Sequence, residues 1–159
     1  MRILVISDTH RKNLLMKEAV ERAGKVDLVL HLGDIEGADE YLTSLCDCPA
    51  IIVRGNNDFF SYQERDRVLE LEGYRILMTH GHNYGVSLTP TRLAEEALSR
   101  NCTIALHGHT HVPGLANVLG VKIFNPGSLG YPRQSSHTNT YGLIEIDRYG
   151  EIHFTICEL

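Results

Sequence analysis

Short apolar runs alternate with polar segments along the first third of the chain. Three of these runs have the length and composition of buried strands, and the two stretches between them carry apolar residues at helical spacing. We therefore expect strands at residues 2–6, 26–32 and 50–53 and helices at residues 14–23 and 38–46. This alternation is typical of an α/β sheet, which places ligands at the carboxyl ends of its strands.

The second half of the chain is mostly strand-like. Thr89 and Pro90 predict the start of one further helix, as its N-cap and its first-turn residue. Glycines between adjacent apolar runs indicate hairpin turns. The runs that we interpret as strands are residues 68–71, 74–78, 103–106, 112–118, 121–124, 140–146 and 151–156. The predicted fold is of the α/β (α+β) class: one domain over residues 1–159, with two mixed β-sheets packed as a sandwich with flanking helices.

The composition disfavours several classes of protein. A hydrophobic fraction of 43% and a charged fraction of 22% are ordinary for a globular chain, and the net charge of -5 argues against a broad cationic surface for nucleic acid. Only four consecutive apolar residues precede Ser7, and no run approaches the roughly 20 that span a bilayer. We therefore expect a cytoplasmic protein. The four cysteines lack paired zinc-type spacing, which predicts reduced thiols.

Nine histidines are the unusual feature of the composition, and several stand in short polar segments that follow predicted strands. Asp8 and His10, and likewise His109 and His111, are two residues apart, so the side chains of each pair can face one side of an extended loop. Taken alone, such signals have structural alternatives, since Asp34 would also serve as a helix cap. Together the strand ends supply seven candidate metal ligands: Asp8, His10, Asp34, Asn56, His80, His109 and His111.

The types of ligand indicate a pair of divalent transition-metal ions. Carboxylate oxygen combined with imidazole nitrogen suits Mn, Fe, Ni, Co or Zn, whereas an all-oxygen set would suit Mg or Ca. Asp34 has two oxygens and can bridge two ions about 3.5 to 4 Å apart. Asn56, otherwise interpreted as a turn residue, supplies a neutral oxygen that does not repel a phosphate. His31, His82 and His107 are candidates for supporting the ligands.

The chain resembles the calcineurin-like metallophosphoesterase family in five motifs, which occur in the order Asp8-x-His10, Gly33-Asp34, Gly55-Asn56-Asn57-Asp58, Thr79-His80-Gly81-His82 and Gly108-His109-Thr110-His111. The likeness extends from residue 1 to about residue 135. The chain length and the segment Asn125-Pro126-Gly127-Ser128 are similar to the small bacterial and archaeal phosphodiesterase branch of that family. This branch is also similar to the retromer scaffold subunit of eukaryotes.

The resemblance implies a β-sandwich flanked by helices and two divalent ions, with manganese the first metal to expect in an assay. It implies the following ligand sets: Asp8, His10 and His111 for the first ion, Asn56, His80 and His109 for the second, and Asp34 as the bridge.

The resemblance also implies a hydrolase of phosphate esters, in the first place a phosphodiesterase, with a hydroxide shared by two ions attacking phosphorus. Asp34, Asn57 and Asp58 are the candidate catalytic residues, and Arg54 and His82 are expected near the substrate. The chain departs from the family at Asn57, where many members have a histidine that protonates the leaving group. Because an asparagine cannot act as an acid, we expect slow hydrolysis of esters with poor leaving groups.

Three other functions are compatible with the sequence: a non-catalytic protein-binding scaffold on the same fold, a nuclease, and a regulatory binder of nucleotides without turnover. The intact ligand set argues against the first, and the acidic charge argues against the second. The expected partner is a small phosphate ester, and the sequence is also compatible with a homo-oligomer. The physiological substrate and the native metal stay open at this level.

Overall fold

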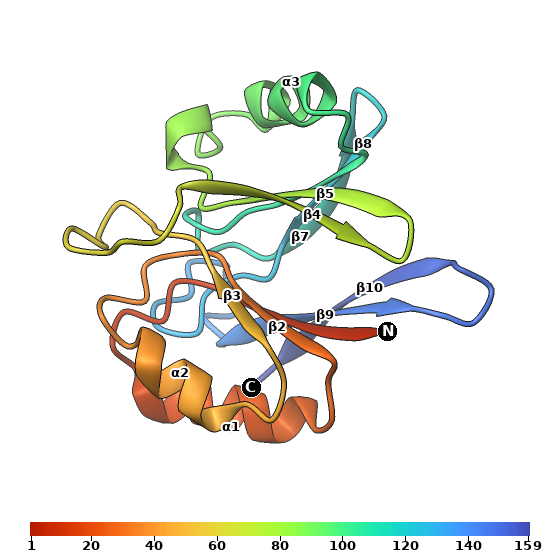
Figure 1. The fold of residues 1–159 in the computed structure, drawn as a ribbon. Helices are drawn as coiled ribbons and strands as arrows, with labels where there is room; N and C mark the ends of the chain where they lie inside the picture. The colour runs from red at the N-terminus through yellow and green to blue at the C-terminus, as the bar shows by residue number, and fades with distance from the viewer.

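Two five-stranded mixed β-sheets pack face to face in the computed structural model, which describes residues 1–159 (Figure 1). The first sheet has the order β10-β9-β1-β2-β3. Its strands are β1 (Arg2–Ile6), β2 (Leu28–His31), β3 (Ala50–Ile52), β9 (Thr140–Ile146) and β10 (Ile152–Glu158). Strands β1, β2 and β3 are parallel, whereas β9 is antiparallel to both of its neighbours. The three parallel strands therefore end at one edge of the sheet.

The second sheet has the order β4-β5-β6-β8-β7. Its strands are β4 (Asp66–Leu71), β5 (Tyr74–Thr79), β6 (Ile104–Leu106), β7 (Gly114–Val118) and β8 (Val121–Asn125). Its three central strands, β5, β6 and β8, are parallel, and the two outer strands are antiparallel to them. The predicted sandwich of two mixed sheets is thus confirmed.

Helices cover the outer faces of both sheets. In Figure 1, α1 (Asn13–Ala23) and α2 (Asp39–Leu45) lie below the first sheet, and α3 (Thr91–Ser99) lies above the second. The short 3-10 helix η1 (His82–Tyr84) follows β5 directly. Helix α1 ends at a glycine: Gly24 has φ +66°, a conformation that glycine adopts without strain.

The alternation of apolar side chains along β1 explains the layers. Ile3 and Val5 are fully buried between the two sheets, in one cluster with Ile76 and Phe124 of the second sheet. Leu4, on the opposite face of the strand, is buried against the helices α1 and α2. A strand buried on both faces favours apolar residues at every position, which is why Ile3 to Ile6 form one continuous apolar run.

Several predicted boundaries differ from the structure. Thr89 is not the helix cap: Pro90 takes that position, and the Thr89 hydroxyl accepts a hydrogen bond from Thr91 N–H at 3.3 Å. Four strands begin later than predicted: β2 begins at Leu28, β6 at Ile104, β7 at Gly114 and β10 at Ile152. All four cysteines are free thiols. No helix is long and apolar enough to cross a membrane.

Candidate metal centre

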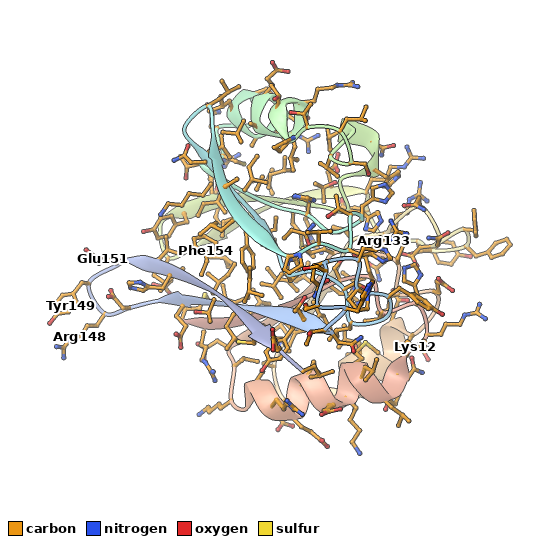
Figure 2. All side chains as sticks on the ribbon, turned by 180° about the vertical axis from the view of Figure 1, so that it is seen from behind. Lys12, Arg133, Arg148, Tyr149, Glu151 and Phe154 are labelled. Carbon is orange, nitrogen blue, oxygen red and sulfur yellow. The ribbon has the colours of Figure 1, made fainter.

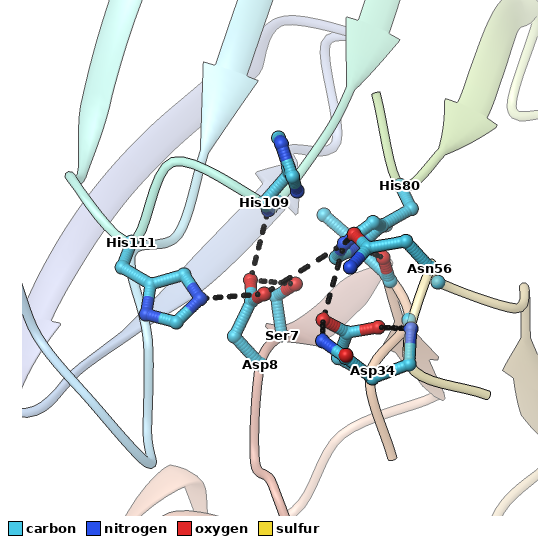
Figure 3. A network of polar contacts seen from close by, with 12 residues as sticks. Ser7, Asp8, Asp34, Asn56, His80, His109 and His111 are labelled. Carbon is cyan, nitrogen blue, oxygen red and sulfur yellow. Dashed lines mark hydrogen bonds and ion pairs between the residues drawn. The ribbon is translucent and has the colours of Figure 1, made fainter. Parts of the chain in front are cut away.

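The loops that follow β1, β2, β3, β5 and β6 meet at one edge of the sandwich and carry the predicted ligands (Figure 3). Backbone hydrogen bonds join the loops to one another. Asp8 N–H donates to Gly33 O at 3.0 Å, which connects the first two loops. Gly108 N–H donates to His80 O at 3.2 Å, which connects the loops of the second sheet. The main chain thus fixes the positions from which the polar side chains converge.

Glycines permit the loops to approach this closely. A Cβ atom on Gly33, which has φ +100°, would lie 2.6 Å from the backbone nitrogen of Gly55. A Cβ atom on Gly108 would lie 1.9 Å from Ser7 Oγ and 2.6 Å from Asp8 Oδ2. No side chain fits at such distances. The glycines beside the ligand positions are therefore needed for the contact between loops.

Two groups of possible ligand atoms form at this edge, and Asp8 belongs to both. The first group adds His10 and His111 and the second adds Asp34 and His80, with the ligand atoms of each group within 4.8 Å of one another. His111 Nε2 lies 3.1 Å from Asp8 Oδ1, and His80 Nε2 lies 3.4 Å from Asp34 Oδ2. Asp34 Oδ2 is also 3.8 Å from His10 Nε2. The bridging role of Asp34 stays a prediction, and Asp8 is placed for the same role.

One oxygen of Asp8 indicates that this group of residues fits a cation. Asp8 Oδ2 accepts hydrogen bonds from Ser7 Oγ at 2.6 Å and from His109 N–H at 3.0 Å. Oδ1 is buried and has no hydrogen-bond partner, although imidazole nitrogens of His111, His80 and His10 lie 3.1, 3.9 and 4.0 Å away. An unpaired buried carboxylate oxygen is costly, and a divalent cation would satisfy it.

The electrostatics keep both carboxylates ionised. Burial raises the pKa of the Asp8 carboxyl, but the adjacent imidazoles of His111 and His80 outweigh burial and lower that pKa below its usual value. Burial likewise raises the pKa of Asp34, and His80 together with the N–H groups of Asn57 brings it far below the usual value. Both side chains are therefore anionic at neutral pH, as metal ligands must be.

Three histidines present Nε2 to these carboxylates because Nδ1 of each is held on the far side. The acceptors are Glu36 Oε1 for His10 at 2.7 Å, Leu32 O for His80 at 2.8 Å and Tyr131 O for His111 at 2.6 Å. Carboxylate and carbonyl oxygens only accept hydrogen bonds, which assigns the ring proton to Nδ1. Nε2 is then free to bind a cation, the orientation usual for ligating histidines.

No motif in the sequence predicted Glu36. Its carboxylate contacts both His10 Nδ1 and Arg11 Nε, the latter at 3.4 Å. Its backbone N–H donates to Asp58 Oδ1 at 2.6 Å, which fixes the start of the side chain. The one signal in the sequence is an acidic residue two positions after Asp34, and such a residue is too common on surfaces to indicate a role.

Asn56 and Asn57 contact the second group of ligands. Asn56 Oδ1 lies 3.1 Å from His80 Nε2. Asn57 donates its backbone N–H to Asp34 Oδ1 at 2.8 Å and its side-chain Nδ2 to Asp34 Oδ2 at 2.7 Å. The alternative interpretation of Asp34 as a helix cap is wrong, because α2 begins at Asp39 with Ala38 at the cap.

Asp58 binds backbone amides with both carboxylate oxygens. Oδ2 accepts from Asp34 N–H at 2.8 Å and from Gly55 N–H at 2.7 Å, and Oδ1 accepts from Glu36 N–H. The side chain is buried. This is the geometry of a residue that positions the loop bearing Asp34, whereas a direct catalytic role for Asp58 stays a prediction.

His109 belongs to neither group of close ligand atoms. Its ring centroid lies 5.1 Å from that of His80, with the rings edge to face, and 6.1 Å from that of His82. In Figure 3 its backbone nitrogen, rather than its ring, is joined to Asp8. The predicted role of the His109 ring as a ligand therefore stays a prediction.

His31 and His107, both candidates for supporting the ligands, are buried beneath the loops. Gly33 N–H donates to His31 Nδ1 at 3.1 Å, so His31 carries its proton on Nε2 and donates it to Thr9 Oγ1 at 3.1 Å. Burial lowers the pKa of His31 to about 3 and that of His107 to about 4. Both rings are neutral and serve as hydrogen-bonding groups of the framework.

The segment after β8 supports the site from below. Ser128 Oγ donates to Asp8 O at 2.9 Å, and Asn125 Nδ2 donates to Gly108 O at 3.1 Å. The Asn-Pro-Gly-Ser motif noted in the sequence thus holds the backbone of two loops that carry candidate ligands.

The backbone is strained at several candidate ligands: Asp8, Asp34 and His111 have φ of +53°, +57° and +59°, a region that non-glycine residues rarely adopt.

A hollow of about 270 Å³ opens beside Asn56. Arg54, Arg65 and His82 line it together with Phe59. Arg54 and His82, predicted to lie near the substrate, therefore share a cavity with a candidate ligand. The two arginines make it a favourable place for an anionic group.

Comparison with known proteins agrees with this geometry. The family model of the calcineurin-like phosphoesterase superfamily domain matches residues 1–149. The chain belongs to this family. A probable metallophosphoesterase of Bacillus subtilis, YsnB, is 30% identical over 148 residues, which cover 92% of this chain and 85% of that protein. Phosphodiesterase YfcE of Escherichia coli is 34% identical over 77 residues, 48% of this chain and 38% of that protein.

Solved structures share the whole fold. A predicted phosphoesterase from Streptococcus pneumoniae superposes with a TM-score of 0.80 at 31% identity, covering 99% of this chain and 97% of that one. A Vps29 variant from Entamoeba histolytica superposes with a TM-score of 0.78 at 22% identity, covering 100% and 99% of the two chains. At that identity the second likeness concerns the fold alone. Family membership makes this protein a metallophosphoesterase, for which divalent metal ions are implied.

Proposed function

We propose that this protein hydrolyses phosphodiesters with the help of two divalent cations bound at the edge where the strand ends meet. The observation that carries the proposal is Asp8, which is shared by both groups of ligand atoms and has one buried oxygen without a hydrogen-bond partner. The name of the relative YfcE supports a diester rather than a monoester as substrate.

The cations would be held by the residues named from the sequence: Asp8, His10 and His111 for one, Asn56, His80 and His109 for the other, and Asp34 between them. Mn, Ni, Fe, Co and Zn all suit this donor set, and Mn is our first choice for an assay. Bound there, the cations would supply Lewis acidity, lowering the pKa of a water and offsetting charge on the phosphoryl oxygens.

Side chains and backbone carbonyls of the protein itself orient the candidate ligands. Glu36, Leu32 O and Tyr131 O direct the three Nε2 atoms, and Asp58 holds the backbone of Asp34. Arg54 and Arg65 would attract the anionic substrate into the hollow beside Asn56. Asn57 donates to Asp34 and has no acidic proton to give, so a leaving group must depart without help from this residue. Diesters with acidic leaving alcohols are therefore the favoured substrates.

The test uses bis(p-nitrophenyl) phosphate and protein stripped of metal with a chelator. We expect no turnover after stripping and recovery on addition of Mn or Ni. Turnover that persists in protein shown to be free of metal by mass spectrometry would refute the proposal.

A matched pair of variants tests the ligand assignment. Asp34→Asn should lose bound metal far more severely than Asn57→Ala, because the first removes a charged ligand and the second removes only one hydrogen bond to it. Equal metal content in the two variants would count against Asp34 as a ligand.

A non-catalytic protein-binding scaffold is the second candidate, and the likeness in fold to Vps29 is compatible with it. Turnover assays on metal-loaded protein distinguish the hydrolase from the scaffold. A protein that binds its metals with full occupancy and yet turns over none of a panel of diesters, monoesters and cyclic nucleotides would favour the scaffold.

A further inference from the structure

Three aromatic side chains stand almost fully in solvent on the segment between β3 and β4. Phe59 is 78% exposed, Phe60 is 96% exposed and Tyr62 shows no burial at all. In Figure 1 this yellow segment projects from the body of the molecule at the left. Exposed aromatic groups of this size, three within four residues, are characteristic of binding surfaces.

The segment begins at the candidate metal centre. Phe59 directly follows Asn57, which donates to the Asp34 carboxylate, and Asp58, which accepts from Asp34 N–H. Together with Arg11, Glu36 and the three aromatic residues, these two residues line a hollow of about 510 Å³. Glu36 also contacts His10, so a single side-chain contact separates this hollow from a candidate metal ligand.

Hydrogen bonds anchor the backbone beneath the exposed rings. Arg54 N–H donates to Glu64 O at 2.9 Å across the base of the segment, and Ser61 N–H donates to Asp58 O at 3.2 Å within it. Gln63 Nε2 donates to Asp39 Oδ1 at 3.0 Å, which ties the segment to α2. The rings therefore stand on a supported backbone and offer their faces for stacking.

The charges around this hollow restrict what it can bind. Glu36, Asp39, Glu40 and Asp58 line it, and Arg11 is its single cation. A second phosphate would be repelled, whereas an uncharged or cationic ring would not. Anionic groups are favoured instead in the hollow of Arg54 and Arg65, which shares Phe59 and Asp58 with this one. The hollow of Arg54 and Arg65 therefore suits the anionic part of an ester, and the hollow beside the aromatic residues suits its uncharged organic part.

We propose that Phe59, Phe60 and Tyr62 form a subsite that stacks on the organic group of the substrate, and that this group carries a planar nitrogen heterocycle of the nucleobase type. The inference rests on the proposed function, since it names the class of diester. Stacking of a base on an aromatic side chain changes affinity by about tenfold or more, which sets the expected size of the effect.

The kinetic test compares two diesters with the same charge and the same leaving group. Thymidine 5′-(p-nitrophenyl) phosphate carries a base, and methyl p-nitrophenyl phosphate does not. With Mn-loaded protein we expect kcat/KM to be at least about tenfold higher for the thymidine ester, and we expect this preference to disappear in Phe60→Ala/Tyr62→Ala, mainly through KM. Tyr149→Ala is the matched control, because Tyr149 is also exposed but lies at the far end of the β9–β10 hairpin (Figure 2).

A preference that is equal in the double variant and in the wild type would overturn the subsite while leaving the proposed hydrolase intact. The subsite can also be tested if the proposed hydrolase activity is absent. This test measures the binding of adenosine 5′-monophosphate and of the base-free ribose 5-phosphate. Tighter binding of the nucleotide, lost about tenfold in the double variant, would support the subsite even if no ester were hydrolysed. Equal binding of the two ligands by the wild type would overturn it.

Discussion

Glu36 Oε1 lies 2.7 Å from His10 Nδ1, and this contact turns His10 Nε2 toward Asp8 and Asp34. A carboxylate behind a ligating histidine fixes its tautomer and increases its basicity. Arg11 holds the same carboxylate in place, and Asp58 holds the backbone of Glu36 by accepting its N–H. The orientation of one candidate ligand thus depends on a residue that belongs to no motif in the sequence.

Replacement of Glu36 is expected to weaken metal binding. Glu36→Ala should lower affinity for Mn by about 10- to 100-fold, because His10 loses its orienting partner, and Glu36→Gln should lower it less, because the amide oxygen still accepts the Nδ1 proton. Titration calorimetry on stripped protein measures both. Glu40→Ala is the control at a neighbouring exposed carboxylate. Affinities for all three variants equal to the wild type would contradict this role.

Asp58→Ala is expected to destabilise the fold as well as the site. The change leaves three backbone N–H groups, those of Asp34, Gly55 and Glu36, without their acceptor. We expect the free energy of unfolding to fall by about 3 kcal/mol. Urea unfolding of stripped protein checks this, and Asp47→Ala, at an exposed position, should change stability by less than about 0.5 kcal/mol. A loss in Asp58→Ala as small as that of the control would show that water replaces the carboxylate.

Gly108→Ala is expected to disturb the site through sterics alone. Its new Cβ would overlap Ser7 Oγ and Asp8 Oδ2, so the loop must move, and we expect about 2 kcal/mol less stability together with reduced metal content. Gly114→Ala is the matched control, because nothing lies within 4 Å of its Cβ position and its φ is not in the left-handed region. The prediction fails if both alanine variants bind metal and unfold like the wild type.

Stability should fall as the pH drops below the ordinary pKa of histidine. His31 has a pKa of about 3 in the folded protein, against the ordinary histidine value of 6.5, so the unfolded chain binds a proton that the folded one does not. The free energy of unfolding is therefore highest above pH 6.5 and falls progressively between pH 6.5 and about 3, by about 2 kcal/mol from pH 6.5 to 5.

His31→Gln tests this assignment, because glutamine accepts from Gly33 N–H and donates to Thr9 without titrating. The variant should show a shallower decline of unfolding free energy with falling pH, measured in urea on metal-free protein. Part of the decline should persist, since His107 also has a lowered pKa, of about 4. If the free energy of unfolding falls equally steeply with pH in the variant and in the wild type, His31 is not the source of the decline.

The sequence by itself determined the order of elements, the two-sheet sandwich and the residues that gather at its edge. Apolar runs such as residues 3–6 identify strands because burial on both faces favours apolar residues throughout. Ligand types such as Asp8 and His111 are readable because they follow those strands, and parallel strands end at one edge. Boundaries such as that at Thr89 were less predictable, since a proline can itself take the cap position.

Only the tertiary structure decided how the side chains are held. Glu36 reaches His10, and Asp58 reaches the amides of Asp34 and Glu36, through contacts between loops, and no local pattern encodes such contacts. The same holds for the exposed aromatic segment, whose position beside the candidate metal centre follows from the path of the chain after β3. Local spacing determines which face a residue occupies, whereas packing of distant segments determines what it meets there.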